Sequence, residues 1–250
     1  MIAKELVDAR WKAIVGGLIT LAAAILITYS YVWVQSLSAT LDRAPLAPAD
    51  RAALTASLQN FDLWAWANWF PKNAPLILVP LAAVLGGSLI AGEVSKGTIF
   101  LLLSRPLSRD QVLLTKYLVS AGTLGAVAGL GGLGLLLTAA TIGHPQPAGG
   151  VLLSTLLLWL GMLAILGVAT LLSVLFADVL RPVVGAMLVA LVAGLPGYVP
   201  GWQDWSLATY WASRPAYFGT GFPALEIGVC LVTAVLPAVA ALLLFRTRAY

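Results

Sequence analysis

One stretch of the sequence gathers charged residues that could bind a partner protein. Residues 92–118 read "GEVSKGTIFLLLSRPLSRDQVLLTKYL" and carry charges of both signs among apolar neighbours. These charges are Glu93, Lys96, Arg105, Arg109, Asp110 and Lys116. Charged side chains of both signs can pair across an interface, so the stretch favours docking of a second protein.

The residues that catalysis or metal binding would need are scarce. The chain has one cysteine, Cys230, and one histidine, His144. It therefore lacks the parts of zinc-type clusters and of histidine-based catalytic sites. No G-x-S-x-G elbow, H-E-x-x-H motif or close carboxylate pair occurs in its apolar segments. We predict that the chain is not an enzyme by itself and that it holds no metal.

Two glycine motifs look like nucleotide-binding loops but lack the required context. "GLGGLG" at residues 129–134 matches G-x-G-x-x-G, yet no strand precedes it and no acidic residue follows about twenty residues later. In "GEVSKGT", no lysine follows the second glycine, Gly97, as a phosphate loop requires. We predict no nucleotide-binding domain and no cofactor in this chain. The G-x-x-x-G spacing of Gly125 and Gly129 instead predicts close helix packing, and we expect it to pair two copies of the chain.

Composition places the chain in a membrane. Apolar residues make up 60% of the sequence, charged residues only 10%, and the mean hydropathy is +0.96, whereas soluble domains carry about 25% charged residues. A membrane-spanning helix needs about 20 apolar residues, because lipid cannot satisfy its backbone groups. Six segments meet this criterion, at roughly residues 13–35, 75–92, 112–140, 151–176, 183–198 and 225–245. We predict an all-α integral membrane protein with six transmembrane helices in a single domain, residues 1–250.

The basic residues predict how the chain is oriented. Six spans put both termini on one side, and only four of the fourteen basic residues fall on the other side, namely Arg43, Arg51, Lys72 and Arg214. By the positive-inside tendency, both termini are then cytoplasmic. A cleaved signal peptide is the alternative for residues 1–40, but its apolar run would be shorter. The positive-inside tendency explains the net charge of +4 without a nucleic-acid partner. We therefore expect the lipid bilayer, and no nucleic acid, as a partner.

Three segments outside the spans have their own character. Residues 1–12 could form an amphipathic helix on the membrane or simply extend the first span. Residues 36–74 form the first outer loop, which we expect to contain an external amphipathic helix that starts near Pro48 and Asp50. Residues 199–224 follow a proline-broken fifth span and are too polar to cross the membrane, while being rich in tryptophan and tyrosine that suit the headgroup region.

Residues 93–111 form the predicted coupling region between the second and third spans. Gly97 lets the chain turn, Pro106 ends a short helix, and Ser108 or Asp110 caps the next span. Lys116 is expected to extend back to the cytoplasmic surface. We expect Glu93 to lie at the water interface, so that its removal costs little stability.

The same residues resemble the signature of type-2 ABC exporter permeases. Glutamate at the end of the second span, then "KGT", an apolar run, "SRP", "SR" and a lysine opening the third span are similar to that family, as are the six spans and the basic tail "FRTRAY". The resemblance implies a coupling helix that docks in a cleft of a separate ATPase subunit, which binds the ATP and Mg. It assigns coupling roles to Glu93, Lys96, Gly97, Thr98, Arg105, Pro106 and Arg109.

The resemblance also implies an assembly and a location. Two permeases, identical or homologous, pair around one pathway, and residues 199–224 form a re-entrant outer segment. An accessory extracytoplasmic protein is a further possible partner. The expected location is the cell membrane of a prokaryote, that is, its inner or plasma membrane.

The expected function is therefore the membrane subunit of an ATP-driven exporter. Two alternatives stay open: an autonomous secondary transporter, which would bury ionisable groups at the membrane midplane, and a scaffold that transmits force without moving a solute. For the coupling residues, the alternative is that they only anchor the topology. The spans offer apolar surface with scattered Thr and Ser and no charged pocket, which favours an amphipathic or lipid-like cargo over a small ion.

Overall fold

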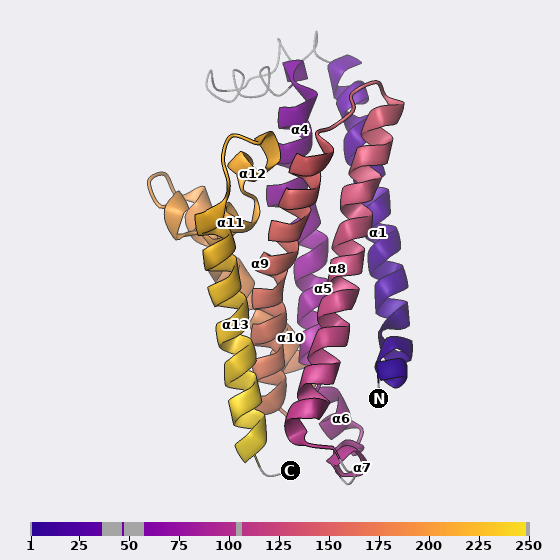
Figure 1. Ribbon diagram of the computed structural model, residues 1–250, viewed down its shortest axis with the longest axis vertical. Coiled ribbons are helices and arrows are strands. Elements are labelled where there is room, and N and C mark those ends of the chain that lie inside the picture. The colour runs from indigo at the N-terminus through magenta and orange to yellow at the C-terminus, as the bar shows by residue number, and fades with distance from the viewer. Residues whose placement is uncertain (1, 37–46, 48–57, 104–106, 249–250) are drawn as a thin grey trace.

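The computed structural model describes residues 2–36, 47, 58–103 and 107–248. Within these ranges the chain forms helices and no strand. The long helices run side by side in an elongated bundle, and the first helix begins at the same end at which the last one finishes (Figure 1). We call this the terminal end of the bundle and the opposite one the distal end. An even number of spans requires this arrangement, while the side of the membrane that the termini occupy stays a prediction.

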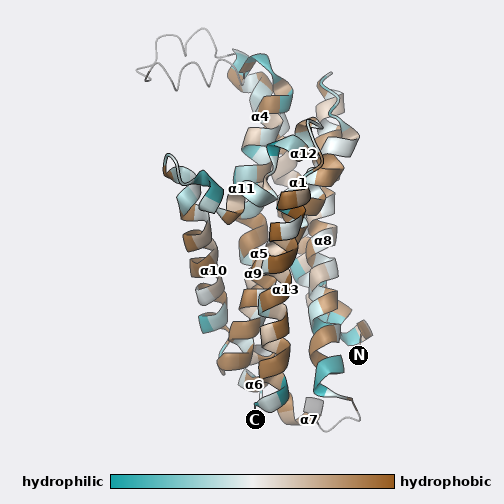
Figure 2. Ribbon diagram, turned by 60° about the vertical axis from the view of Figure 1, so that its left-hand side comes forward, coloured by the Kyte–Doolittle hydropathy of each residue, from teal (hydrophilic) through white to brown (hydrophobic). Residues whose placement is uncertain are grey.

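Six helical segments of the described chain are long and apolar enough to cross a membrane, so the predicted number of spans is confirmed. In chain order they are α1 (Ile2–Ser36), Phe61–Gly87, α8 (Arg109–Thr141), α9 (Ala148–Leu175), Leu180–Tyr198 and α13 (Ala224–Thr247). Hydrophobic residues cover the lengths of these helices, and hydrophilic residues gather towards the two ends of the bundle (Figure 2).

The helix α9 forms the centre of the bundle and packs against α5 (Ala74–Gly87), α8, α10 (Leu180–Gly194) and α13. Small residues let its neighbours approach closely. A Cβ at Gly86 of α5 would lie 2.5 Å from the carbonyl oxygen of Leu166, and one at Gly167 would lie 2.9 Å from the ring of Pro237. Close backbone approach of this kind is how membrane helices associate where lipid offers no hydrophobic driving force.

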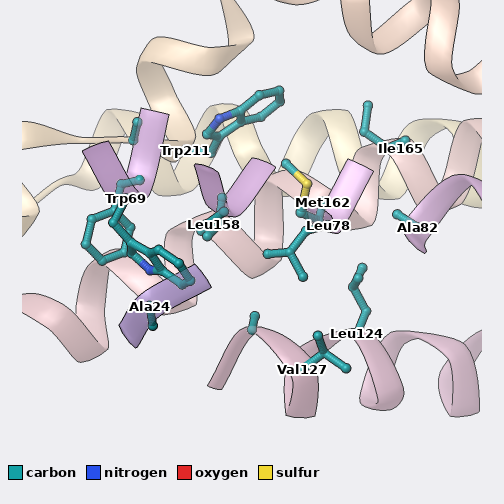
Figure 3. Close-up of a cluster of buried hydrophobic side chains, with 14 of the residues drawn as sticks. Ala24, Trp69, Leu78, Ala82, Leu124, Val127, Leu158, Met162, Ile165 and Trp211 are labelled. Atoms are coloured by element: carbon teal, nitrogen blue, oxygen red, sulfur yellow. The ribbon is translucent and has the colours of Figure 1, made fainter. Parts of the chain in front are cut away.

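The buried side chains form one large cluster along α9 and its neighbours. In Figure 3, Leu158, Met162 and Ile165 of α9 face side chains of α1, α5 and α8 in the same cluster. Trp69 and Trp211 belong to the same cluster, and each is almost fully buried. Aromatic side chains of this size bury large apolar areas, so they contribute strongly to the packing of the cluster.

The second span is longer than predicted, and the outer loop is correspondingly shorter. The sequence placed the span at residues 75–92, but it consists of α4 (Phe61–Asn68), a π-helical turn (Trp69–Asn73) and α5 (Ala74–Gly87). Asn60 caps the start of α4 by accepting hydrogen bonds from two backbone amides. The boundaries 36–74 for the outer loop are therefore wrong from Phe61 onwards. The predicted external amphipathic helix near Pro48 and Asp50 lies outside the described residues.

Pro71 explains the π-helical turn within this span. Proline has no amide hydrogen, so the regular i→i+4 ladder cannot pass through it unchanged. The amide of Ala74 bonds instead to the carbonyl of Trp69, five residues back, and the side chain of Asn73 donates to the carbonyl of Asn68 over 2.7 Å. These substitutes carry the helix past the proline, which is why the polar and aromatic residues before it are helical rather than a loop.

Residues 2–12 are continuous with the first span, which is the second of the two interpretations left open by the sequence. The helix α1 runs without a break through this segment, and Glu5 and Ala9 are buried against the bundle. The fifth span ends as a 3-10 turn at Leu195–Tyr198, where the sequence predicted that prolines would break it.

The segment between the fifth and sixth spans forms three short helices at the distal end. They are a 3-10 turn (Gln203–Trp205), α11 (Leu207–Trp211) and α12 (Arg214–Phe218). Trp211 and Tyr217 are buried, and the indole of Trp66 donates to the carbonyl of Ala212 over 3.0 Å. These contacts hold the segment on the bundle, while its re-entry into the membrane stays a prediction.

Candidate functional site

The predicted coupling region forms two short helices at the terminal end of the bundle, between the second and third spans (Figure 1). They are α6 (Ala91–Ser95) and α7 (Ile99–Leu103). Gly97 joins them with a φ of +69°, in the left-handed region that glycine adopts without strain. Ile99 is buried with Val112 of α8 and Phe245 of α13, so α7 is held by two spans.

Glu93 lies inside this region rather than at its surface. Its Oε1 is 2.9 Å from the ammonium nitrogen of Lys116, and the same nitrogen is 3.0 Å from Glu5 Oε1. Lys4 lies 3.6 Å from Glu93. We call these four residues the Lys116 cluster. It contains two positive and two negative charges, and it links α1, α6 and α8.

Lys116 is buried, with 4% of its side chain exposed, so the prediction that it extends back to the cytoplasmic surface is wrong. A buried ammonium group is costly unless it is paired and hydrogen-bonded. Glu5 supplies the second carboxylate from a position 111 residues away in the sequence. Sequence reasoning missed Glu5, although a lysine set in an apolar span is a signal that a carboxylate must lie nearby.

The pKa of Glu93 reflects these neighbours. Burial alone raises the pKa of the carboxyl, because it disfavours the charged form. The hydrogen bond from the Thr98 hydroxyl and the contact with Lys116 outweigh burial and lower the pKa of Glu93 to about 2, from an ordinary value of 4.5. Glu93 is therefore ionised at neutral pH, and its charge holds α6 to α8.

Arg109 contacts the end of the last span. Its Nη1 donates to the carbonyl oxygens of Phe245 over 3.0 Å and of Arg246 over 3.4 Å, and also to that of Arg248. Cations at a helix C-terminus satisfy its unpaired carbonyls and interact favourably with the helix dipole. Next to it, Asp110 accepts two 2.8 Å hydrogen bonds from the guanidinium of Arg246. The start of α8 is thus fastened to the end of α13.

Of the predicted coupling residues, Lys96 and Gly97 are exposed. On α7, Phe100 is 64% and Leu101 70% exposed. We call Lys96, Gly97, Phe100 and Leu101 the docking face. Thr98 is half-buried beside Glu93, and Glu93 and Arg109 make contacts within the chain. The described residues of the predicted set therefore divide into an exposed group and a group that packs within the chain. Arg105 and Pro106 lie outside the described residues.

The two glycines predicted to pair copies of the chain face different surroundings. A Cβ at Gly125 would lie 3.0 Å from the indole nitrogen of Trp159 in α9, so this glycine serves packing within the chain. A Cβ at Gly129 would meet no atom within 4 Å. Gly129 therefore remains available to another helix, and pairing through it stays a prediction.

The six long apolar helices define a multi-pass α-helical membrane protein. The described residues contain no group of three or more side chains that could hold a metal ion. Residues 4–195 match the family described as ABC-2 family transporter protein. The chain therefore belongs to this family of ABC transporter permeases, and the predicted resemblance is confirmed. No match is found among curated proteins.

Proposed function

We propose that the chain is the membrane-spanning permease subunit of an ATP-binding cassette exporter, driven by ATP that a separate subunit hydrolyses with Mg. The family match supports this directly. The structural observation that carries the coupling step is the attachment of α6 and α7 to three spans. Because of these attachments, α6 and α7 form one unit with the spans. A partner that binds the docking face and moves this unit therefore also moves the spans.

The contacts that make the unit rigid come from different parts of the chain. The Lys116 cluster joins α6 to α1 and α8 through ion pairs with distances of 2.9 to 3.6 Å. Ile99 joins α7 to α8 and α13 through buried apolar contacts. Because packed interfaces shift between discrete arrangements instead of deforming smoothly, such a unit can pass a movement of the ATPase into the bundle.

The docking face has the chemistry of a protein contact. Phe100 and Leu101 offer apolar area beside the cation of Lys96, and partly exposed aromatic side chains next to a charge are typical of interface anchors. In this proposal two permease copies, or this chain and a homologous one, pair with two ATPase subunits in a prokaryotic cell membrane with both termini cytoplasmic. The cargo moved outward would be amphipathic.

Thiol crosslinking tests the docking step. Cys230 is buried, so a cysteine introduced by Lys96→Cys is the reactive thiol in the described part of the chain. A crosslink from it to an ATPase co-purified with the tagged permease, and loss of cargo-stimulated ATP hydrolysis in a Lys96→Glu/Phe100→Ala variant, are the expected results.

Arg181, which is exposed at the start of α10, supplies the matched controls. Arg181→Cys should form no crosslink to the ATPase, and Arg181→Ala should keep the wild-type stimulation of hydrolysis. Two results would overturn the proposal. One is a purified permease with which no ATPase co-purifies, and the other is a docking-face variant in which cargo stimulates ATP hydrolysis as strongly as in the wild type.

A further inference from the structure

A groove opens between α5 and α10 towards the distal end of the bundle. The two helices touch near Gly87, where a Cβ would lie 2.8 Å from a methyl group of Val183. Beyond this contact a cavity of about 700 Å³ lies between them. Leu76, Val79, Leu188 and Leu191 line its sides, and the buried Trp211 contributes to its wall. In Figure 2, α10 stands at the left edge of the bundle.

A second cavity of about 360 Å³ continues the groove and has a different character. Both cavities are lined by Lys72, Gly194 and Tyr198, so these residues mark the junction. The second cavity adds Arg214 and Glu226. The groove is thus apolar along α5 and α10 and charged where it passes under α12.

The charge at this end is positive. None of the ion pairs among the described residues involves Lys72 or Arg214. The guanidinium of Arg214 lies 5.7 Å from the ring of Trp66 and 5.5 Å from that of Phe218, which holds it in place. Glu226 accepts a 3.0 Å hydrogen bond from Ser213. Two cations and one carboxylate therefore leave a single positive charge over the cavity.

An occupant of the whole groove must be apolar at one end and negatively charged at the other. We propose that the groove binds one anionic phospholipid of the surrounding bilayer, with an acyl chain between α5 and α10 and its phosphate between Lys72 and Arg214. The apolar side chains that line the larger cavity can contact an acyl chain, just as the lipid-facing side chains of any membrane helix do. Phosphate forms strong charge-assisted hydrogen bonds with lysine and arginine, and the net positive charge selects an anionic headgroup. This proposal does not rest on the exporter function.

Lipid binding to the purified full-length chain tests the headgroup. Native mass spectrometry with added phosphatidylglycerol counts bound lipid without any ATPase, so its outcome is separate from that of the proposed function. The Lys72→Gln/Arg214→Gln variant should bind phosphatidylglycerol about tenfold more weakly, since it loses two charge-assisted contacts. The Arg10→Gln/Arg181→Gln control removes the same charge from exposed positions outside the groove and should bind like the wild type.

A second variant tests the acyl chain. Gly194 has a φ of −89°, and a Cβ there would meet no atom within 4 Å. Gly194→Leu therefore fits without strain, while its side chain occupies the junction of the two cavities. It should weaken phosphatidylglycerol binding about tenfold, whereas Gly228→Leu, at an equally open glycine of α13, should not.

Three results would overturn the proposal. The first is unchanged binding in the charge variant, and the second is unchanged binding in Gly194→Leu when both variants retain the wild-type melting temperature. The third is equal binding of zwitterionic phosphatidylethanolamine by the wild type, because a site with one net positive charge should prefer the anionic lipid.

Discussion

Lys116 of α8 lies 2.9 Å from Glu93 of α6, and it bridges that glutamate to Glu5 of α1. The sequence placed Glu93 among surface residues that dock a partner, but the carboxylate faces inward and its partners are in the same chain. In the proposed coupling step, Glu93 would therefore act through the position of α6. The exposed residues of the docking face are left to make the contact.

Removing the Glu93 side chain should destabilise the protein, contrary to the expectation that its loss costs little. Glu93→Ala leaves Lys116 buried with only Glu5 as a near carboxylate, and breaking a buried ion pair costs about 3 to 5 kcal/mol when no partner remains. Because Glu5 stays, we expect a loss of about 2 kcal/mol in the free energy of unfolding. Thermal unfolding in detergent measures it.

Lys96→Ala is the control for this measurement, since Lys96 is exposed one turn further along and surface substitutions usually change stability by less than about 0.5 kcal/mol. A Glu93→Ala protein as stable as Lys96→Ala would mean that the Lys116 cluster does not hold α6 in place.

The Lys116 cluster should also make stability depend on pH in the acid range. The pKa of Glu93 is lowered from 4.5 to about 2 in the folded protein, so the folded state favours the ionised form. The stabilisation is fully present above pH 4.5 and is lost as the pH falls towards 2.

Glu93→Gln removes the titrating group and keeps the shape of the side chain. The difference in melting temperature between wild type and Glu93→Gln should therefore shrink as the pH falls from 4.5 to 2. A difference that stays constant over this range would show that Glu93 has an ordinary pKa in the folded protein.

Arg109 should control the end of the last span. Arg109→Ala removes the donors to the carbonyls of Phe245 and Arg246, so the last turn of α13 should open more often. Amide hydrogen exchange should rise within residues 244–248 and stay unchanged in the middle of α13, where no such cap acts. Arg10→Ala, at an exposed site on α1, is the control. Unchanged exchange at the end of α13 would show that the cap contributes nothing there.

The sequence predicted the spans well because each one is a long apolar run, and the bilayer allows few alternatives to a helix. It failed at Phe61–Asn73, where Asn, Lys and Pro suggest a loop. There the Asn60 cap and the Asn73 side chain satisfy the backbone locally, and buried Trp69 and Phe70 bring the segment into the bundle. Tertiary contacts therefore determined that this segment is helical, although its local sequence pattern is compatible with a loop.

The candidate site shows the same limit. The sequence predicted one short helix after the turn at Gly97, and α7 lies there, whereas α6 before Gly97 was not predicted. The predicted helix end at Pro106 lies outside the described residues. The burial of Glu93 could not be predicted, because it depends on Glu5 and Lys116 arriving from two other helices. Sequence spacing reports which charges lie near one another along the chain, and it does not report which of them the fold turns inward.

The two glycines of α8 offer a last test, of the pairing between permease copies. Gly125→Leu should destabilise the monomer, because a Cβ there already lies 3.0 Å from the Trp159 indole and overpacking typically costs about 1 to 3 kcal/mol. Gly129→Leu meets no atom of its own chain within 4 Å, so it should keep the melting temperature and weaken only the association of copies. Native mass spectrometry in lipid nanodiscs reports the association, and Gly228→Leu on α13 controls for adding an apolar side chain. If Gly129→Leu leaves the dimer fraction at the wild-type value, copies do not pair through this face of α8.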